Sequence, residues 1–137
     1  MDASASNGLV TRASAFSVRE TIDRLVHEVT ARGLIVFARI DHAASAASVG
    51  MALRPTELLI FGNPRGGTPL MQDQQTAGID LPVKALAWED ASGRTWLTYN
   101  DAAWIGARHA LGTESADAVK AIAAGMELVT GLAATAA

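Results

Sequence analysis

Apolar and polar residues recur along the first third of the chain with the periods of strands and helices. Residues 9–16 are typical of a short strand. Ser17 then starts a helix, because its hydroxyl can accept the backbone N–H of Glu20 while the Glu20 side chain reaches back. Gly33 ends that helix, and residues 34–40, which are β-branched, aromatic and too few for a helix, predict a strand buried on both faces. The apolar face of the helix is formed by Val18, Ile22, Leu25, Val26 and Val29.

The middle of the chain predicts an alanine-rich helix followed by a strand. The helix spans residues 43–53 and ends before Pro55, since proline disfavours helical angles in the residue that precedes it. Residues 57–61 form the next strand. We expect another surface to pack closely on the small side chains of the helix, which are Ala43, Ala46, Ala47 and Gly50.

A loop, a short helix and a hairpin come next. Residues 62–67 are rich in turn formers and predict the loop, and Thr68 caps a helix that ends near Gly78. Residues 83–89 and 95–99 are two strands joined by a short turn that contains glycine. This is a hairpin signature, so we expect the two strands to be antiparallel neighbours.

Two helices close the chain. Asp101 caps the first of them and Gly112 ends it. The last helix begins at residues 113–115 and has a narrow apolar stripe that packs on the sheet or on a partner. The stripe consists of Val119, Ile122, Met126 and Val129.

This order of elements predicts a single α+β domain with a five-stranded sheet, mixed or mainly antiparallel, covered by helices. We expect residues 1–8 to be a disordered N-terminus, residues 9–112 to form the domain, and residues 113–137 to add a C-terminal helix and tail.

Composition and charge exclude several classes of protein. There are 14 acidic and 11 basic residues, which give a net charge of −3, so we expect no nucleic-acid partner. The absence of cysteine rules out disulfides, thiolate metal sites and cysteine nucleophiles. No apolar run approaches the roughly 20 residues that span a bilayer, and the first residues lack the regions of a secretory signal. We therefore expect a cytoplasmic protein without a membrane partner.

The motifs do not indicate a cofactor or a metal. The three histidines are scattered and form no His-x-His or His-Glu-x-x-His motif. His42 or Met71 could ligate haem, but Met71 is better explained as part of the core. Residues 65–67 precede a helix and could hold an anion with their N–H groups. The lysine and serine of a Walker motif and the glycine pattern of a dinucleotide site are, however, missing.

Six stretches of the chain, in a fixed order, resemble one known family. They are Phe37-Ala-Arg-Ile-Asp-His42, Leu53-Arg-Pro-Thr-Glu-Leu-Leu-Ile-Phe-Gly-Asn-Pro64, Gly67-Thr-Pro-Leu-Met71, Ala77-Gly-Ile-Asp-Leu-Pro82, Trp88-Glu-Asp90 and Tyr99-Asn-Asp101. Residues 17–111 are thereby similar to the domain of unknown function 302 (DUF302) family. The resemblance implies a small α+β domain that forms a homodimer, and it implies no reaction. Ala102 stands where members often have proline, so Asp101 alone must hold the first turn of that helix.

Polar residues at predicted strand ends and on strand faces are the candidates for a site. His42 with Asp41 or Glu57 is the chemically interesting subset, because an imidazole beside a carboxylate can act as a general base at neutral pH. Arg54 would add a planar fork for a carboxylate or a phosphate. The whole set consists of Asp41, His42, Arg54, Glu57, Asn63, Lys84 and Asn100.

Each of these residues also has a structural interpretation. Asp41 can cap the following helix, and His42 can satisfy backbone groups at the same place. Arg54 and Glu57 can pair with each other or across a dimer interface. The two asparagines can stabilise turns, and Lys84 can extend to water or form an ion pair.

Three hypotheses from different classes follow. In the first, a homodimeric binding domain holds a small polar or anionic ligand in a cleft rimmed by Asp41, His42, Arg54, Glu57, Lys84 and Asn100, with Asn63 as a further ligand-binding candidate. In the second, an enzyme uses His42 as the general base, supported by Asp41 or Glu57, on a substrate anchored by Arg54. In the third, a structural module uses Arg54, Glu57 and the small-residue helix surface for the dimer contact. The stripe of the last helix offers a further face for dimerisation.

Overall fold

The computed structural model describes residues 7–136 of the 137-residue chain. The strands are β1 (Leu9–Ser14), β2 (Ile35–Asp41), β3 (Thr56–Gly62), β4 (Val83–Glu89) and β5 (Thr95–Asn100). The helices are α1 (Val18–Ala31), α2 (His42–Ser48), α3 (Pro64–Asp73), α4 (Ala102–Arg108) and α5 (Ala116–Ala134), with two 3-10 helices, η1 (Gln75–Asp80) and η2 (Thr113–Ser115). Most of the expected disordered N-terminus, residues 1–6, lies outside the described part.

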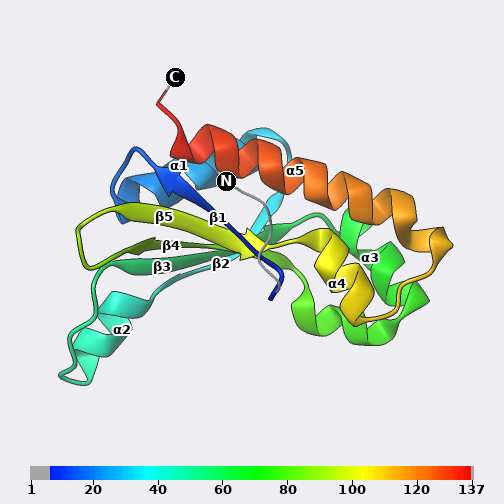
Figure 1. Ribbon diagram of the computed structural model, residues 1–137, viewed down its shortest axis with the longest axis horizontal. Coiled ribbons are helices and arrows are strands. Elements are labelled where there is room, and N and C mark those ends of the chain that lie inside the picture. Colours follow the sequence, from blue (N-terminus) through cyan, green and yellow to red (C-terminus); the bar gives the residue numbers. More distant parts are fainter. Residues whose placement is uncertain (1–6, 137) are drawn as a thin grey trace.

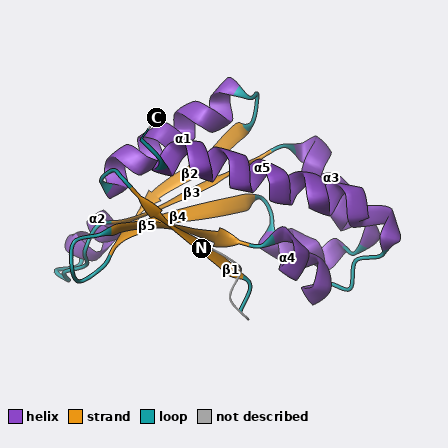
Figure 2. Cartoon of the chain, turned by 45° about the horizontal axis from the view of Figure 1, so that its top comes forward, coloured by secondary structure: helices purple, strands orange, loops and turns teal. Residues whose placement is uncertain are grey.

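The five strands form one antiparallel sheet in the order β1-β5-β4-β3-β2. Helices α1 and α5 lie side by side on one face of this sheet, as Figures 1 and 2 show. The α+β class, the five strands and the hairpin of β4 and β5 predicted from the sequence are therefore confirmed.

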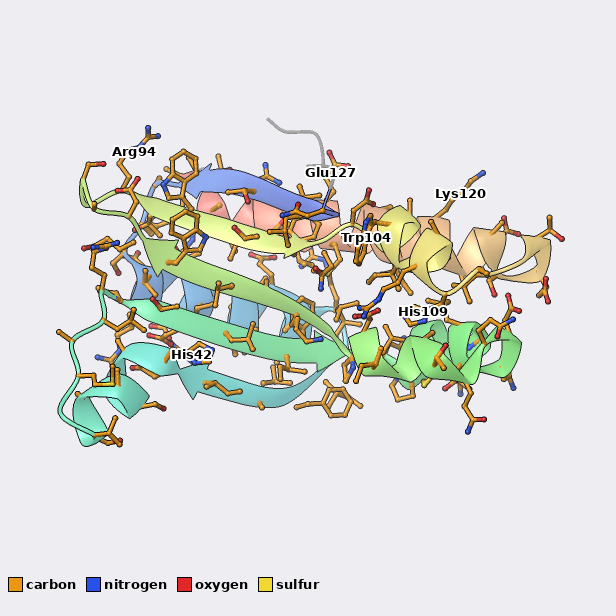
Figure 3. All side chains as sticks on the ribbon, turned by 60° about the horizontal axis from the view of Figure 1, so that its bottom comes forward. His42, Arg94, Trp104, His109, Lys120 and Glu127 are labelled. Atoms are coloured by element: carbon orange, nitrogen blue, oxygen red, sulfur yellow. The ribbon has the colours of Figure 1, made fainter. Side chains whose placement is uncertain are left out.

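Side chains alternate between the two faces of the sheet, and only one face is buried in the core. Leu59 and Phe61 of β3 face the helices and are almost completely buried. Their neighbours Leu58 and Ile60 point to the other face and are only partly buried. We call this second surface the open face; Figure 3 looks onto it and shows no helical layer in front of the strands.

Hydrogen bonds from one arginine side chain to backbone carbonyls join the two helices of the covered face. The Arg24 side chain of α1 donates through Nε to the carbonyl of Ala133, and through Nη2 to the carbonyls of Leu132 and Thr135, at 3.0 to 3.1 Å. The last carbonyls of a helix lack partners within the helix, and a cation also favours the negative end of its dipole. Arg24 therefore fixes the C-terminal end of α5 against α1.

Local signals placed several element ends correctly. The Ser17 hydroxyl accepts the backbone N–H of Glu20 at 3.1 Å, and Gly33 adopts a φ of +77° just after α1. The apolar stripe of α5, exemplified by Met126 and Val129, packs within the chain in the core beneath the sheet-covering helices. None of the described helices combines the length and the apolar character that a membrane span requires.

Three expectations about local structure are wrong. Strand β2 is at the edge of the sheet rather than buried on both faces, and its Phe37 is 51 % exposed. Helix α2 ends at Ser48 rather than near residue 53, because Gly50 turns the chain with a φ of +78°. Helix α3 begins at Pro64, before the predicted cap Thr68, since the Asn63 side chain already caps it.

Candidate functional site

The structure divides the seven predicted site residues between the two ends of the sheet. Four of them lie at the end next to α2, where β2 and β4 end and β3 and β5 begin; they are Asp41, His42, Arg54 and Glu57. The other three lie at the opposite end, near α3 and α4; they are Asn63, Lys84 and Asn100. Figure 3 shows His42 at the first end and His109 at the second. The predicted cleft, which six of these residues would rim without Asn63, is therefore not assembled.

At the end next to α2, the predicted catalytic arrangement does not form. Asp41 caps α2 by accepting the N–H of Ala44 at 2.9 Å, as its structural interpretation required. His42 is exposed, and no hydrogen bond joins it to a carboxylate of any described residue. Arg54 donates to the carbonyl of Glu89 at 3.2 Å. The imidazole therefore lacks the carboxylate contact that a general base of this type needs.

Glu57 has a different partner from the one predicted. It lies on the covered face of β3, is 8 % exposed, and accepts from Arg39 Nε at 2.9 Å. Arg39 also donates to Asp23 of α1 at 2.7 Å. Burial alone would lower the pKa of Arg39, but its hydrogen bonds to Asp23 and Glu57 outweigh that effect and raise it. Arg54 and Glu57 therefore do not pair with each other within the chain, because Arg39 lies on the same face of the adjacent strand as Glu57.

The three residues at the other end do not converge either. Asn63 caps α3, with its Oδ1 accepting the N–H of Arg65 at 3.0 Å. Lys84 lies on the open face, opposite Ile60 of β3. Asn100 ends β5 and pairs with Leu9 of β1. Of these three, only Asn63 lines the cavity described next.

A cavity of about 410 Å³ lies where α3 and α5 meet the end of the sheet. Its wall is formed by residues of five elements and of the loops that join them. The sheet contributes Phe37, Phe61 and Val83, α3 contributes Thr68 and Met71, and α5 contributes Ile122, Gly125 and Met126. The lining is largely apolar, and of the described residues that form it none carries a charge. Such a cavity is suited to bind a small molecule.

Two local features shape this cavity. The pairing of β2 with β3 shifts in register between Val36 and Ala38, so Phe37 is the extra residue of a bulge and reaches the cavity mouth. Gly125 of α5 also lines the cavity, and a Cβ added there would meet no other atom within 4 Å. The chain thus places an aromatic ring at the mouth and no side chain at the middle of the wall.

Polar bonds outside the cavity hold its wall in place. Asp80 of η1 accepts from His109 Nε2 at 2.6 Å and from Arg108 Nη1 at 3.0 Å, and the other nitrogen of His109 lies 3.1 Å from the hydroxyl of Thr76. Asp73 of α3 accepts the N–H of Gly112 and the hydroxyl of Ser115, which lower the pKa of Asp73 in that order. These contacts tie α3 and η1 to α4 and α5.

The relay of Thr76, His109 and Asp80 has the residue types of a hydrolytic triad, but Thr76 is exposed and lies outside the cavity lining. We interpret it as a structural link. Among residues 7–136, no group of three histidine or acidic side chains is placed to hold a metal. Three residues were not among the candidates taken from the sequence, namely Arg39, Asp80 and Gly125, although Arg39 and Asp80 both stand within stretches that carried the family resemblance.

Comparison with known proteins identifies the family. The model of the domain of unknown function DUF302 matches residues 10–129. The chain belongs to the DUF302 family. The match extends into α5, beyond the residues that carried the resemblance in the sequence. A crystal structure of an uncharacterized conserved DUF302 protein from Bacillus stearothermophilus has the same fold, with a TM-score of 0.73, 20 % identity, and coverage of 93 % of this chain and 95 % of that one.

Curated relatives of this DUF302 protein carry a functional name. The fluoride-specific ion channel FluC 1 of Brucella suis biovar 1 (strain 1330) is 54 % identical over 124 residues, which are 90 % of this chain and 49 % of the relative. The protein of the same name in Brucella abortus biovar 1 (strain 9-941) matches equally well over 46 % of its length. The DUF302 chain therefore spans about half the length of the curated relatives that it matches.

The Arg39 bridge yields a stability prediction. Replacing Arg39 with methionine (Arg39→Met) leaves the carboxylate of Glu57 buried without its cation, so we expect the free energy of unfolding to fall by about 1–3 kcal/mol. Urea denaturation measures this change. The control Arg32→Met breaks an exposed pair with Glu28 on α1 and should cost less than about 0.5 kcal/mol. Adding Glu57→Leu to Arg39→Met should restore most of the loss; a double variant no more stable than the single one contradicts the explanation.

Proposed function

We propose that this DUF302 protein is a small-ligand-binding domain whose ligand occupies the cavity between α3 and α5. The observation that carries the proposal is Gly125. A glycine inside a helix weakens it by about 1 kcal/mol relative to alanine. At Gly125 a methyl group would fit without any contact, so packing within the chain does not require glycine there. A bound molecule beside α5 would require it.

Another glycine of α5 illustrates the difference. A Cβ at Gly131 would lie 3.2 Å from Arg12 Nη1, so close packing against β1 accounts for that glycine. Gly125 has no such neighbour; it is exposed and lines the cavity. The proposed ligand position thus replaces the cleft that was expected around six of the polar residues, and of all seven candidates it retains only Asn63.

We also propose that the domain forms a homodimer through its open face. Residues 47–55, which follow the middle of α2, are all exposed, and they include Val49, Met51 and Leu53 at 71 %, 67 % and 51 % exposure. Figure 1 shows α2 projecting from the sheet on the side away from α1 and α5. We call α2 and residues 49–55 the arm.

The arm and the open face support a reciprocal contact between two copies. The open face carries partly buried apolar side chains, among them Leu58, Leu86 and Trp88. Burying the arm and this face against water is favourable, roughly in proportion to the apolar area covered. In a two-fold dimer, the arm of each copy would lie on the open face of the other. The same contact would then form twice, and both surfaces of both copies would be covered. The cytoplasmic location expected from the sequence stays a prediction.

The Gly125 observation predicts opposite effects for two substitutions. Gly125→Ala should raise the free energy of unfolding by about 1 kcal/mol, because alanine favours the helix and meets no atom. Gly125→Leu should fill the cavity and abolish saturable binding of the uncharged fluorescent probe N-phenyl-1-naphthylamine. Urea denaturation and fluorescence titration measure the two effects. The control Ala124→Leu adds the same side chain one residue away, outside the lining, and should leave probe binding unchanged. Equal probe binding by wild type and Gly125→Leu would refute the proposed site.

The dimer proposal is tested by a charge on the arm. Leu53→Asp should convert the dimer to a monomer in size-exclusion chromatography with light scattering at micromolar concentration, since it places a carboxylate in the apolar contact. The control Leu128→Asp alters a leucine of the same exposure on α5, 50 % against 51 %, and should leave the dimer intact. A wild-type monomer, or a dimer that survives Leu53→Asp, would count against this arrangement.

The curated relatives favour a second candidate function. Identity of 54 % over 90 % of the chain to half of a protein named a fluoride-specific ion channel supports a role as an accessory domain of a fluoride channel. Deleting the coding sequence in its source organism should then lower the fluoride concentration that stops growth, and the wild-type gene should restore it. Unchanged fluoride tolerance in the deletion strain would exclude this role while leaving the ligand proposal in place.

A further inference from the structure

The chemistry of the cavity wall indicates what kind of molecule it accepts. We infer that the ligand is uncharged, with an apolar body inside the cavity and one hydrogen-bonding head at its α3 end. This inference rests on the proposed function, and it adds the chemical class of the ligand. It also differs from the polar or anionic ligand that the sequence suggested.

The described lining of the cavity has no charged group that could pair with a charge on a ligand. None of the described lining residues is ionisable at neutral pH, and the two polar side chains among them are Asn63 and Thr68. A charged group that loses water in such surroundings has no counter-ion to compensate it. A ligand with a charge inside the cavity would therefore bind weakly.

The start of α3 lines the cavity, and backbone N–H groups at such a helix start could have held an anion. The N–H of Arg65 donates to Asn63 Oδ1 at 3.0 Å. The N–H groups of Gly66 and Gly67 donate to the carbonyl of Asn63 at 2.8 and 3.1 Å. Because the first turn of α3 already uses its donors, it offers little to a phosphate or a carboxylate.

The side-chain amide of Asn63 offers a position for the head of the ligand. Oδ1 of Asn63 is used in capping, and its Nδ2 forms no hydrogen bond to any described residue, so the side chain retains two donors. Asn63 lines the cavity at the start of α3, so these donors lie at the α3 end of the cavity. A hydroxyl, an ether or a carbonyl oxygen of the ligand can accept from them.

The apolar part of the lining is suited to the body of such a ligand. Phe37 lies at the mouth with half of its surface in water, an arrangement that an apolar ligand would improve by covering the ring. Met71 and Met126 line the interior, and their flexible thioethers adapt to the shape of an apolar partner. The volume of about 410 Å³ lies within the range of small-molecule sites.

A matched series of ligands tests the inference. 1-Decanol, decanoate and decylammonium share one chain and differ in the charge of the head. Each competes with N-phenyl-1-naphthylamine for the wild-type protein at pH 7.4, and fluorescence measures the displacement. We expect decanol to displace the probe at a concentration at least tenfold lower than either charged compound. Asn63→Ser retains a capping hydroxyl but removes the amide donors, and it should weaken decanol between about two- and tenfold.

The outcomes separate this inference from the proposed function. Displacement by decanoate or decylammonium equal to that by decanol, abolished in Gly125→Leu, would overturn the uncharged class and leave the cavity as the binding site. Probe binding that Gly125→Leu does not affect would overturn the proposed function itself. The control Asp101→Ser changes the cap of α4, away from the cavity, and should leave decanol binding unchanged; a loss equal to that of Asn63→Ser would remove Asn63 from recognition.

Discussion

The rest of the structure depends on the one-sided burial of an antiparallel sheet. Leu59 and Phe61 point into the core only in the observed register of β3, and a shift of one residue would send them to the open face. Helices α1 and α5 stabilise this register, because their apolar side chains pack in the same core as Leu59 and Phe61. Arg24 joins the two helices at the end of α5, so the covering layer acts as one unit.

The cavity is a geometrical consequence of that layer. Helix α5 extends beyond the sheet and reaches α3, as Figure 1 shows, so its middle turns lie above the point where the strands stop. Residues at the ends of β3 and β4 line the cavity together with Gly125, and residues of α3 complete the wall. The bonds of Asp73 and Asp80 then keep α3 at a fixed distance from the start of α5. A cavity that arises from the placement of helices requires few particular residue types. This explains why no sequence motif indicated it.

The relatives place this domain in a wider context. The structure from Bacillus stearothermophilus shows that the fold persists at 20 % identity. The longer Brucella protein is 54 % identical to this chain over about half of its own length. The same domain therefore occurs beside other segments in those proteins. The open face and the arm are surfaces through which such a domain can contact a second copy or a neighbouring segment. The cavity lies at the other end of the sheet from α2, so ligand binding and such contacts need not compete.

Local interactions were readable from the sequence alone. The caps formed by Ser17, Asp41 and Asp101, the hairpin of β4 and β5 and the helical periodicity of α1 depend on residues close together in the chain, so a single sequence determined them. The edge position of β2, the partner of Glu57 and the cavity around Gly125 depend on which distant elements become neighbours. Tertiary structure alone decided these, because the same apolar strand or helical glycine fits several environments until the sheet order is set.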